Sequence, residues 1–178
     1  MPAFPSFPVL LFAGLYAVTL ALVAGFFGPH NLALSAALAV PLVWLSVTDL
    51  ERKIIPDTAN ALVALIGLAR HLSGDLTGLQ IDLAAAIIVF LVLWIASEVY
   101  WRRNQKEALG LGDVKLLAAG TFCVGTLHIW QVILCGSVGG ILAYYLARRG
   151  SRKVDSGIPF GPFLAYGLFL TFTVLVDQ

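Results

Sequence analysis

The sequence predicts an all-α protein that crosses a lipid bilayer several times. Hydrophobic residues fill 60% of its 178 positions, charged residues only 12%, and the mean hydropathy is +0.92. A soluble domain carries about 25% charged residues. The apolar runs lack period-2 alternation, so we expect helices and not the strands of a barrel. Eleven Lys and Arg are balanced by ten Asp and Glu, which leaves no basic face and excludes nucleic acid as a partner.

Seven apolar segments between polar breaks are each expected to form a membrane helix, for which about 20 residues make a full crossing. No basic residue precedes the first segment, so we expect a retained span and not a cleaved signal. Seven segments leave little chain for a second unit, and residues 1–178 are expected to form a single membrane-embedded domain. The expected segments are 8–27, 31–48, 58–72, 80–101, 113–124, 127–147 and 160–176.

The stretch 113–147 is too long to be one span. A continuous helix of this length would measure about 52 Å, against a hydrocarbon core of about 30 Å. We therefore expect a break marked by Gly120, Gly125 and Thr126. The segment 113–124 is then expected to be a short helix, and the sequence leaves open whether it crosses the bilayer fully.

The basic residues predict the orientation of these segments, because Lys and Arg collect in cytoplasmic loops. With seven segments, the loops 49–57, 102–112 and 148–159 fall on one side and hold nine of the eleven basic residues. Arg70 falls at the opposite end. We therefore predict a cytoplasmic N-terminus and an external C-terminus.

Two acidic residues, Asp49 and Asp113, are expected at the same cytoplasmic boundary. Two adjacent carboxyl groups cannot both ionise easily, so they share a proton, and one can activate water while the other polarises a carbonyl. Gly110 and Gly112 precede Asp113 and could adopt backbone angles closed to other residues, which would let a substrate backbone approach. The alternative is that Asp113 is a helix cap and Asp49 a boundary residue.

Three separated segments contain further motifs: Asp49 to Asp57 with its Ile-Pro-Asp end, Gly-Leu-Gly-Asp-Val-Lys at Gly110 to Lys115, and Ile158 to Gly167. In their order and sequence, these segments resemble the type IV prepilin peptidase family of Gly-x-Gly-Asp intramembrane aspartic proteases. The resemblance implies that Asp49 and Asp113 are the catalytic pair. It also implies removal of a leader peptide from prepilin-like or pseudopilin precursors at the cytoplasmic face of the bacterial inner membrane, without a metal or cofactor.

The chain resembles the short members of the family. Longer members carry a cytoplasmic insert with paired Cys-x-x-Cys motifs and also methylate the new pilin N-terminus. Here only three residues separate the first two expected segments, so N-methyltransferase activity is not expected. The resemblance implies a substrate with a basic leader and an apolar helix that docks between the spans.

Other polar residues have more than one interpretation. Lys115 and Glu51 are candidates for substrate binding, although lipid contact or pairing with neighbouring charges explains them as well. Asp57 is expected to cap the third segment, with a rival role as the first acid. Glu98 is expected to pair with Arg102 one turn later.

Metal sites are not expected from the Cys and His residues. Cys123 and Cys135 lie in apolar runs without Cys-x-x-Cys spacing, and His30, His71 and His128 are dispersed, in or beside external loops, where we expect them to be solvated. Two other functions remain open at this point. One is a small transporter or channel that uses the boundary carboxylates, and the other is a scaffold that holds pilin precursors without cleaving them.

Overall fold

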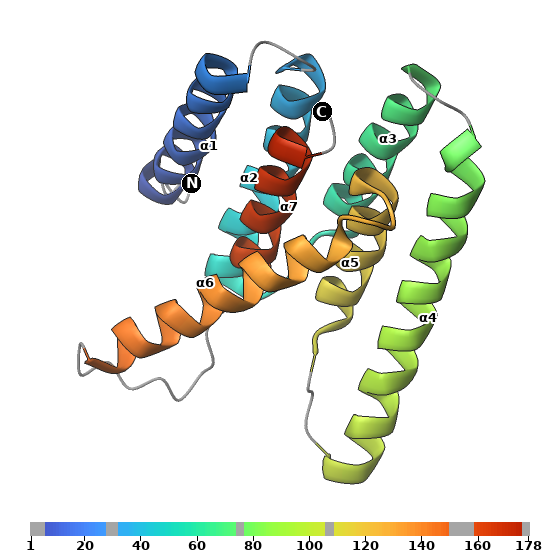
Figure 1. Cartoon of the computed structure of the whole chain (residues 1–178). Coiled ribbons are helices and arrows are strands. Elements are labelled where there is room, and N and C mark those ends of the chain that lie inside the picture. The colour runs from blue at the N-terminus through green and yellow to red at the C-terminus, as the bar shows by residue number, and fades with distance from the viewer. Residues whose placement is uncertain (1–5, 28–31, 74–76, 106–108, 150–158, 176–178) are drawn as a thin grey trace.

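The computed structural model describes residues 6–27, 32–73, 77–105, 109–149 and 159–175. These residues form seven α-helices and, within the described ranges, no strand (Figure 1). The all-α class is therefore confirmed. The helices are α1 (Ser6–Phe27), α2 (Leu32–Arg52), α3 (Asp57–Ser73), α4 (Thr77–Asn104), α5 (Leu111–Val124), α6 (Ile129–Arg149) and α7 (Gly161–Leu175).

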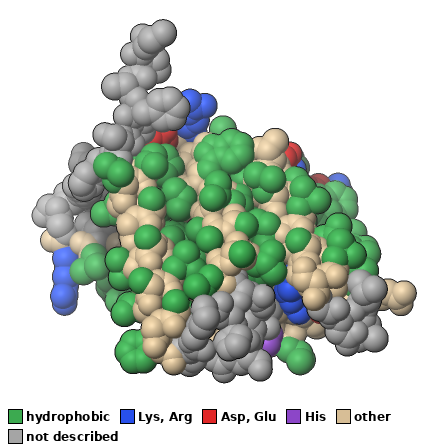
Figure 2. Space-filling view, turned by 90° about the horizontal axis from the view of Figure 1, so that it is seen from above, with side chains coloured by type: hydrophobic (Ala, Val, Ile, Leu, Met, Phe, Trp, Pro, Cys, Tyr) green, Lys and Arg blue, Asp and Glu red, His purple; other side chains and the backbone are tan. Residues whose placement is uncertain are grey.

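Four helices, α1, α2, α4 and α6, are long and apolar enough to cross a membrane, and α7 is a shorter apolar helix. Large apolar side chains are exposed along α1, α4 and α6, among them Leu22, Ile88 and Leu142. Figure 2 shows apolar side chains spread across the viewed face, with few charged groups among them. An exposed apolar surface of this extent is suited to lipid, and the chain is a multi-pass membrane protein.

The core lies between α2 and α7, which pack side by side near the centre of the molecule (Figure 1). Leu38, Leu42 and Leu45 recur at helical spacing along one face of α2 and are fully buried. They belong to one apolar cluster with Leu168 and Phe172 of α7. Close packing of these two helices fixes the end of α2 against the start of α7.

The break in the long stretch lies at Gly125, as the length argument predicted. Gly125 has a φ of +86°, a conformation that L-residues with side chains rarely adopt, and α6 begins four residues later. Gly120 is buried inside α5, so the expectation that it marks the break was wrong. The resulting α5 has 14 residues, which confirms that this helix is short.

Polar groups from α3 and α4 hold the turn after α5. Asp82 Oδ1 accepts hydrogen bonds from the Thr126 N–H at 2.9 Å and the Thr126 hydroxyl at 2.8 Å. Arg70 donates to the Cys123 carbonyl at 2.8 Å, at the helix end where a cation is favourable. His71 Nε2 lies 3.5 Å from Asp82 Oδ2, and His71 is 3% exposed. His71 is thus buried against Asp82, which corrects the expectation of a solvated histidine.

Candidate active site

Asp49 lies in the last turn of α2, where it is buried. The segment expected to end near residue 48 continues as helix to Arg52, so Asp49 projects from a rigid element. The Gly161 N–H, in the first turn of α7, donates a hydrogen bond to Asp49 Oδ2 at 3.0 Å. A free N–H at a helix start is a natural partner for a carboxylate, because the first turn of a helix has no internal acceptors for its N–H groups.

Glycine is required at position 161 by the closeness of this approach. A Cβ atom placed on Gly161 would lie 2.7 Å from Asp49 Oδ2 and 3.0 Å from its Cγ. The family resemblance included residues 158–167, but the sequence did not predict that Gly161 is the partner of Asp49. The sequence did contain a signal for this role, since a glycine lies between Phe160 and Pro162 at the start of the last helix.

Asp113 lies in the first turn of α5, and its side chain is partly buried. Its Oδ1 atom is buried and has no hydrogen-bond partner among the described residues.

Ile55 lies against the starts of α5 and α7, next to Asp113 and to the glycine that binds Asp49. Its side chain is 8% exposed. A Cβ atom on Gly112 would lie 2.9 Å from Ile55 Cβ, and one on Gly161 would lie 3.1 Å from Ile55 Cδ1. The loop between α2 and α3 therefore brings the start of α5 and the start of α7 together, and Asp49 and Asp113 converge at this end of the bundle.

The structure gives the two glycines before Asp113 different roles from the one expected, which was to adopt backbone angles closed to other residues. Gly110 has φ −64° and ψ 141°, an extended conformation that any residue adopts, so unusual backbone angles do not explain it. A Cβ atom there would lie 3.4 Å from Asp113 Oδ2, an ordinary contact. Gly112 is needed because Ile55 packs directly against its backbone.

Lys115 forms an ion pair with Asp57, at 2.7 Å to Oδ1 and 2.9 Å to Oδ2. This contact joins the N-terminal part of α5 to the first turn of α3. Asp57, the rival first acid, is exposed and bonded to Lys115, whereas Asp49 is the buried carboxyl near Asp113. Glu51 is exposed in the last turn of α2.

The predicted pair of Glu98 and Arg102 is confirmed at 2.7 Å. His30, which was expected to be solvated, lies outside the described residues. Within the described ranges, no group of three or more His, Cys, Asp or Glu side chains could hold a metal ion.

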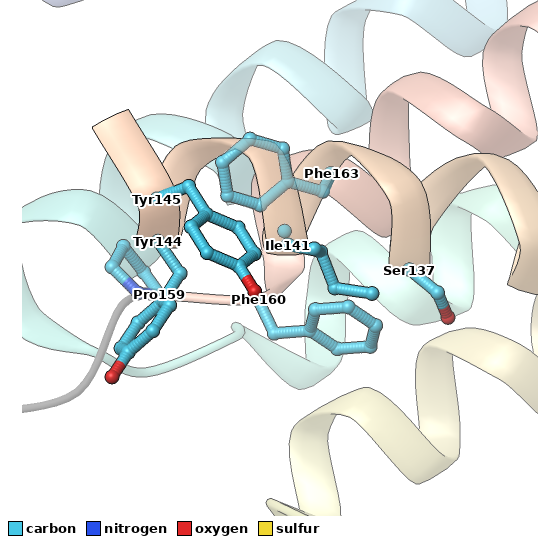
Figure 3. Close-up of a pocket in the computed structure, with 8 residues that line it drawn as sticks. Ser137, Ile141, Tyr144, Tyr145, Pro159, Phe160 and Phe163 are labelled. Atoms are coloured by element: carbon cyan, nitrogen blue, oxygen red, sulfur yellow. The ribbon is translucent and has the colours of Figure 1, made fainter. Parts of the chain in front are cut away.

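A pocket of about 610 Å³ lies between α6 and the start of α7. Figure 3 shows Tyr144, Tyr145 and Ile141 of α6 facing Phe160 and Phe163 across it. Phe160 directly precedes Gly161, so this aromatic and aliphatic pocket is continuous along the chain with the residue that binds Asp49.

Comparison with known proteins identifies the family. The model of the type IV leader peptidase family matches residues 36–145. The chain belongs to this family. The matched range contains both Asp49 and Asp113.

Several curated relatives are bacterial prepilin leader peptidase/N-methyltransferases. That of Burkholderia pseudomallei strain 1026b is 34% identical over 143 residues, which cover 79% of this chain and 46% of the relative. That of Escherichia coli strain K12 is 32% identical over 123 residues, which cover 69% of this chain and 55% of the relative. The chain thus spans about half the length of the curated relatives that it matches. No solved structure matches this leader peptidase family member significantly.

Proposed function

We propose that this protein is a membrane aspartic endopeptidase that removes the leader peptide from a prepilin-like or pseudopilin precursor. The observation that carries the proposal is the convergence of Asp49 and Asp113 around Ile55 at one end of the helices. Membership of the leader peptidase family and the names of the relatives support the substrate class. The transporter and scaffold alternatives have no observation of their own in their favour.

The two carboxyl groups divide the work of peptide hydrolysis. Asp49, whose Oδ2 accepts the Gly161 N–H, is suited to the ionised role, because hydrogen bonds to a carboxylate favour its charged form. Asp113, whose Oδ1 has no partner among the described residues, is suited to the protonated role. Water attacks the scissile carbonyl carbon while Asp49 takes a water proton and Asp113 donates its proton to the carbonyl oxygen.

The resulting tetrahedral diol collapses in the second step. Asp49 returns its proton to the leaving nitrogen as the C–N bond breaks, and Asp113 recovers a proton from one of the two hydroxyl groups. Both carboxyl groups then have their starting protonation. No metal takes part in this scheme.

We infer the position of the substrate from the same arrangement. We place the acid end at the cytoplasmic face of a bacterial inner membrane, with the basic leader in the cytoplasm and the apolar helix among the spans. The exposed carboxylate of Glu51 can attract a basic leader, and Gly110 leaves the approach to Asp113 open. The aromatic and aliphatic pocket at Phe160 and Phe163 suits apolar side chains beyond the scissile bond.

Co-expression with a prepilin-like precursor tests the proposal. Cleavage is read as a mobility shift and as a new N-terminus by sequencing. Asp49→Asn and Asp113→Asn should each lower cleavage by about 100-fold or more, the usual contribution of general acid–base groups. Glu98→Gln is the matched control, because it makes the same carboxyl-to-amide change at an exposed surface pair. Full processing by both aspartate variants would overturn the proposed pair. Solute flux that depends on these aspartates, without processing, would favour a transporter.

A further inference from the structure

Asn60 is a buried amide without a hydrogen-bond partner. It lies in the first turns of α3, is 6% exposed, and neither its Nδ2 nor its Oδ1 has a partner among the described residues. Burying an amide without a hydrogen bond is costly in an apolar interior. Buried polar groups are otherwise paired almost everywhere in proteins, so an unpaired one calls for a physical reason.

The helix register turns this amide toward α5. The helices α3 and α5 run parallel, because Asp57 binds Lys115 at their starts and Gly67 packs on Cys123 near the end of α5 (Figure 1). Asn60 precedes Gly67 by seven residues, or two turns, and so lies on the same face of α3.

The same register gives the level of Asn60 along α5. Two turns before Cys123 on α5 is Leu116, which lies one turn after Asp113. Asn60 therefore faces α5 within about one turn of Asp113, whose buried Oδ1 is also unpaired. Two unsatisfied polar side chains thus lie at nearly the same level along α3 and α5.

We propose that the Asn60 amide binds the peptide backbone of the substrate beside the scissile bond. An amide offers one acceptor and two donors, which match the C=O and N–H groups of an extended peptide. In a water-poor site, a peptide without such partners would leave its own backbone groups unpaired. Asn60 is on this basis a substrate-binding residue for the proposed peptidase, and the inference rests on that proposed function.

Asn60→Leu should change the stability of the free protein and the rate of precursor cleavage in opposite directions. Leu has a similar volume and removes the unpaired polar atoms, so the thermal midpoint in detergent should stay equal or rise. The kcat/KM for precursor cleavage should fall by about 10- to 100-fold, the effect of removing a hydrogen-bond partner from a buried polar group. A residue with a purely structural hydrogen bond would instead lose stability when replaced.

Gln131→Leu provides the matched control. Gln131 is another amide with an unpaired buried oxygen, and it lies in the first turn of α6, at the far end of α5 from Asp113. Its replacement should leave kcat/KM unchanged.

Three results would overturn the inference. Wild-type kcat/KM in Asn60→Leu, while Asp49→Asn is inactive, would remove the role of Asn60 and leave the proposed peptidase intact. A lowered thermal midpoint with a matching loss of cleavage would make Asn60 a structural residue. Absence of precursor cleavage by the unaltered protein would overturn the proposed function and the role of Asn60 with it.

Discussion

Lys115 and Asp57 join the N-terminal part of α5 to the first turn of α3 through an ion pair of 2.7 Å. The side chains are 34% and 71% exposed, and a pair so exposed contributes only about 0–1 kcal/mol to stability. Its consequence is positional, because Lys115 lies two residues after Asp113 and holds the start of its helix.

Reversing these charges separates an anchoring role from a substrate-binding role of Lys115. Lys115→Asp places like charges across α3 and α5 and should lower kcat/KM for precursor cleavage several-fold, with little change in thermal midpoint. The double variant Lys115→Asp with Asp57→Lys should recover much of the lost activity. If Lys115 contacts the substrate, the double variant will be as impaired as the single one. Asp57→Asn alone should lose far less activity than Asp49→Asn.

Gly161→Ala should disable the site without removing either acid. The added methyl group would lie 2.7 Å from Asp49 Oδ2, so the carboxylate or the start of α7 has to move. A displacement of about 1 Å at a reacting group can cost about 100-fold in rate. The measurement is kcat/KM for cleavage in membranes.

Gly14→Ala is the corresponding control, because a Cβ atom at Gly14 of α1 meets no other atom within 4 Å. Its cleavage rate and thermal midpoint should match those of the unaltered protein. Wild-type activity in Gly161→Ala would show that cleavage does not depend on the close approach of residue 161 to Asp49.

Replacing Asp82 should reduce stability more than activity. Asp82→Ala removes the acceptor of two hydrogen bonds from Thr126 at the turn between α5 and α6. A typical intramolecular hydrogen bond contributes about 0.5–1.5 kcal/mol, so the loss of both bonds should lower the thermal midpoint in detergent. Asp82→Asn keeps an acceptor oxygen and should lose less. Because this turn is at the far end of α5 from Asp113, cleavage at a temperature well below the midpoint should be nearly normal.

The predicted orientation has its own test by cysteine labelling. In a background with Cys123 and Cys135 replaced, single cysteines are introduced at Ser73 and Asn104, which are both exposed at helix ends. An external residue 73 should react with a membrane-impermeant maleimide in intact cells. A cytoplasmic residue 104 should react only after the cells are opened. The reverse pattern would contradict a cytoplasmic N-terminus.

The sequence predicted the elements and the end of the bundle at which the acids meet. Helix number and class followed from apolar run lengths, and the break near Gly125 followed from the length of a bilayer crossing. Both signals are local and depend on few physical quantities. The parity of the crossings then put Asp49 and Asp113 at one end, as the contacts around Ile55 show.

Contacts between distant segments could not be predicted in the same way. The bond from Gly161 to Asp49 depends on how α7 packs against α2, and the need for Gly112 depends on the position of Ile55. Periodicity records which face of a helix is buried, but not the partner that covers it. His71 was misjudged for this reason, since its position near a helix end did not reveal that Asp82 packs against it.

The short length of α5 determines the distance between Asp113 and the C-terminal end of α4. Asp82 binds Thr126, so α4 and α5 share one level at that end, but α4 continues for about 33 Å to Asn104 whereas α5 reaches Asp113 after about 20 Å. The start of α5 therefore lies about 13 Å short of the C-terminal end of α4 along the helix direction, and Figure 1 shows α4 continuing beyond it. Roughly four extended residues cover this distance. A precursor that approaches the proposed site along α4 would therefore need several unwound residues between the end of that helix and Asp113.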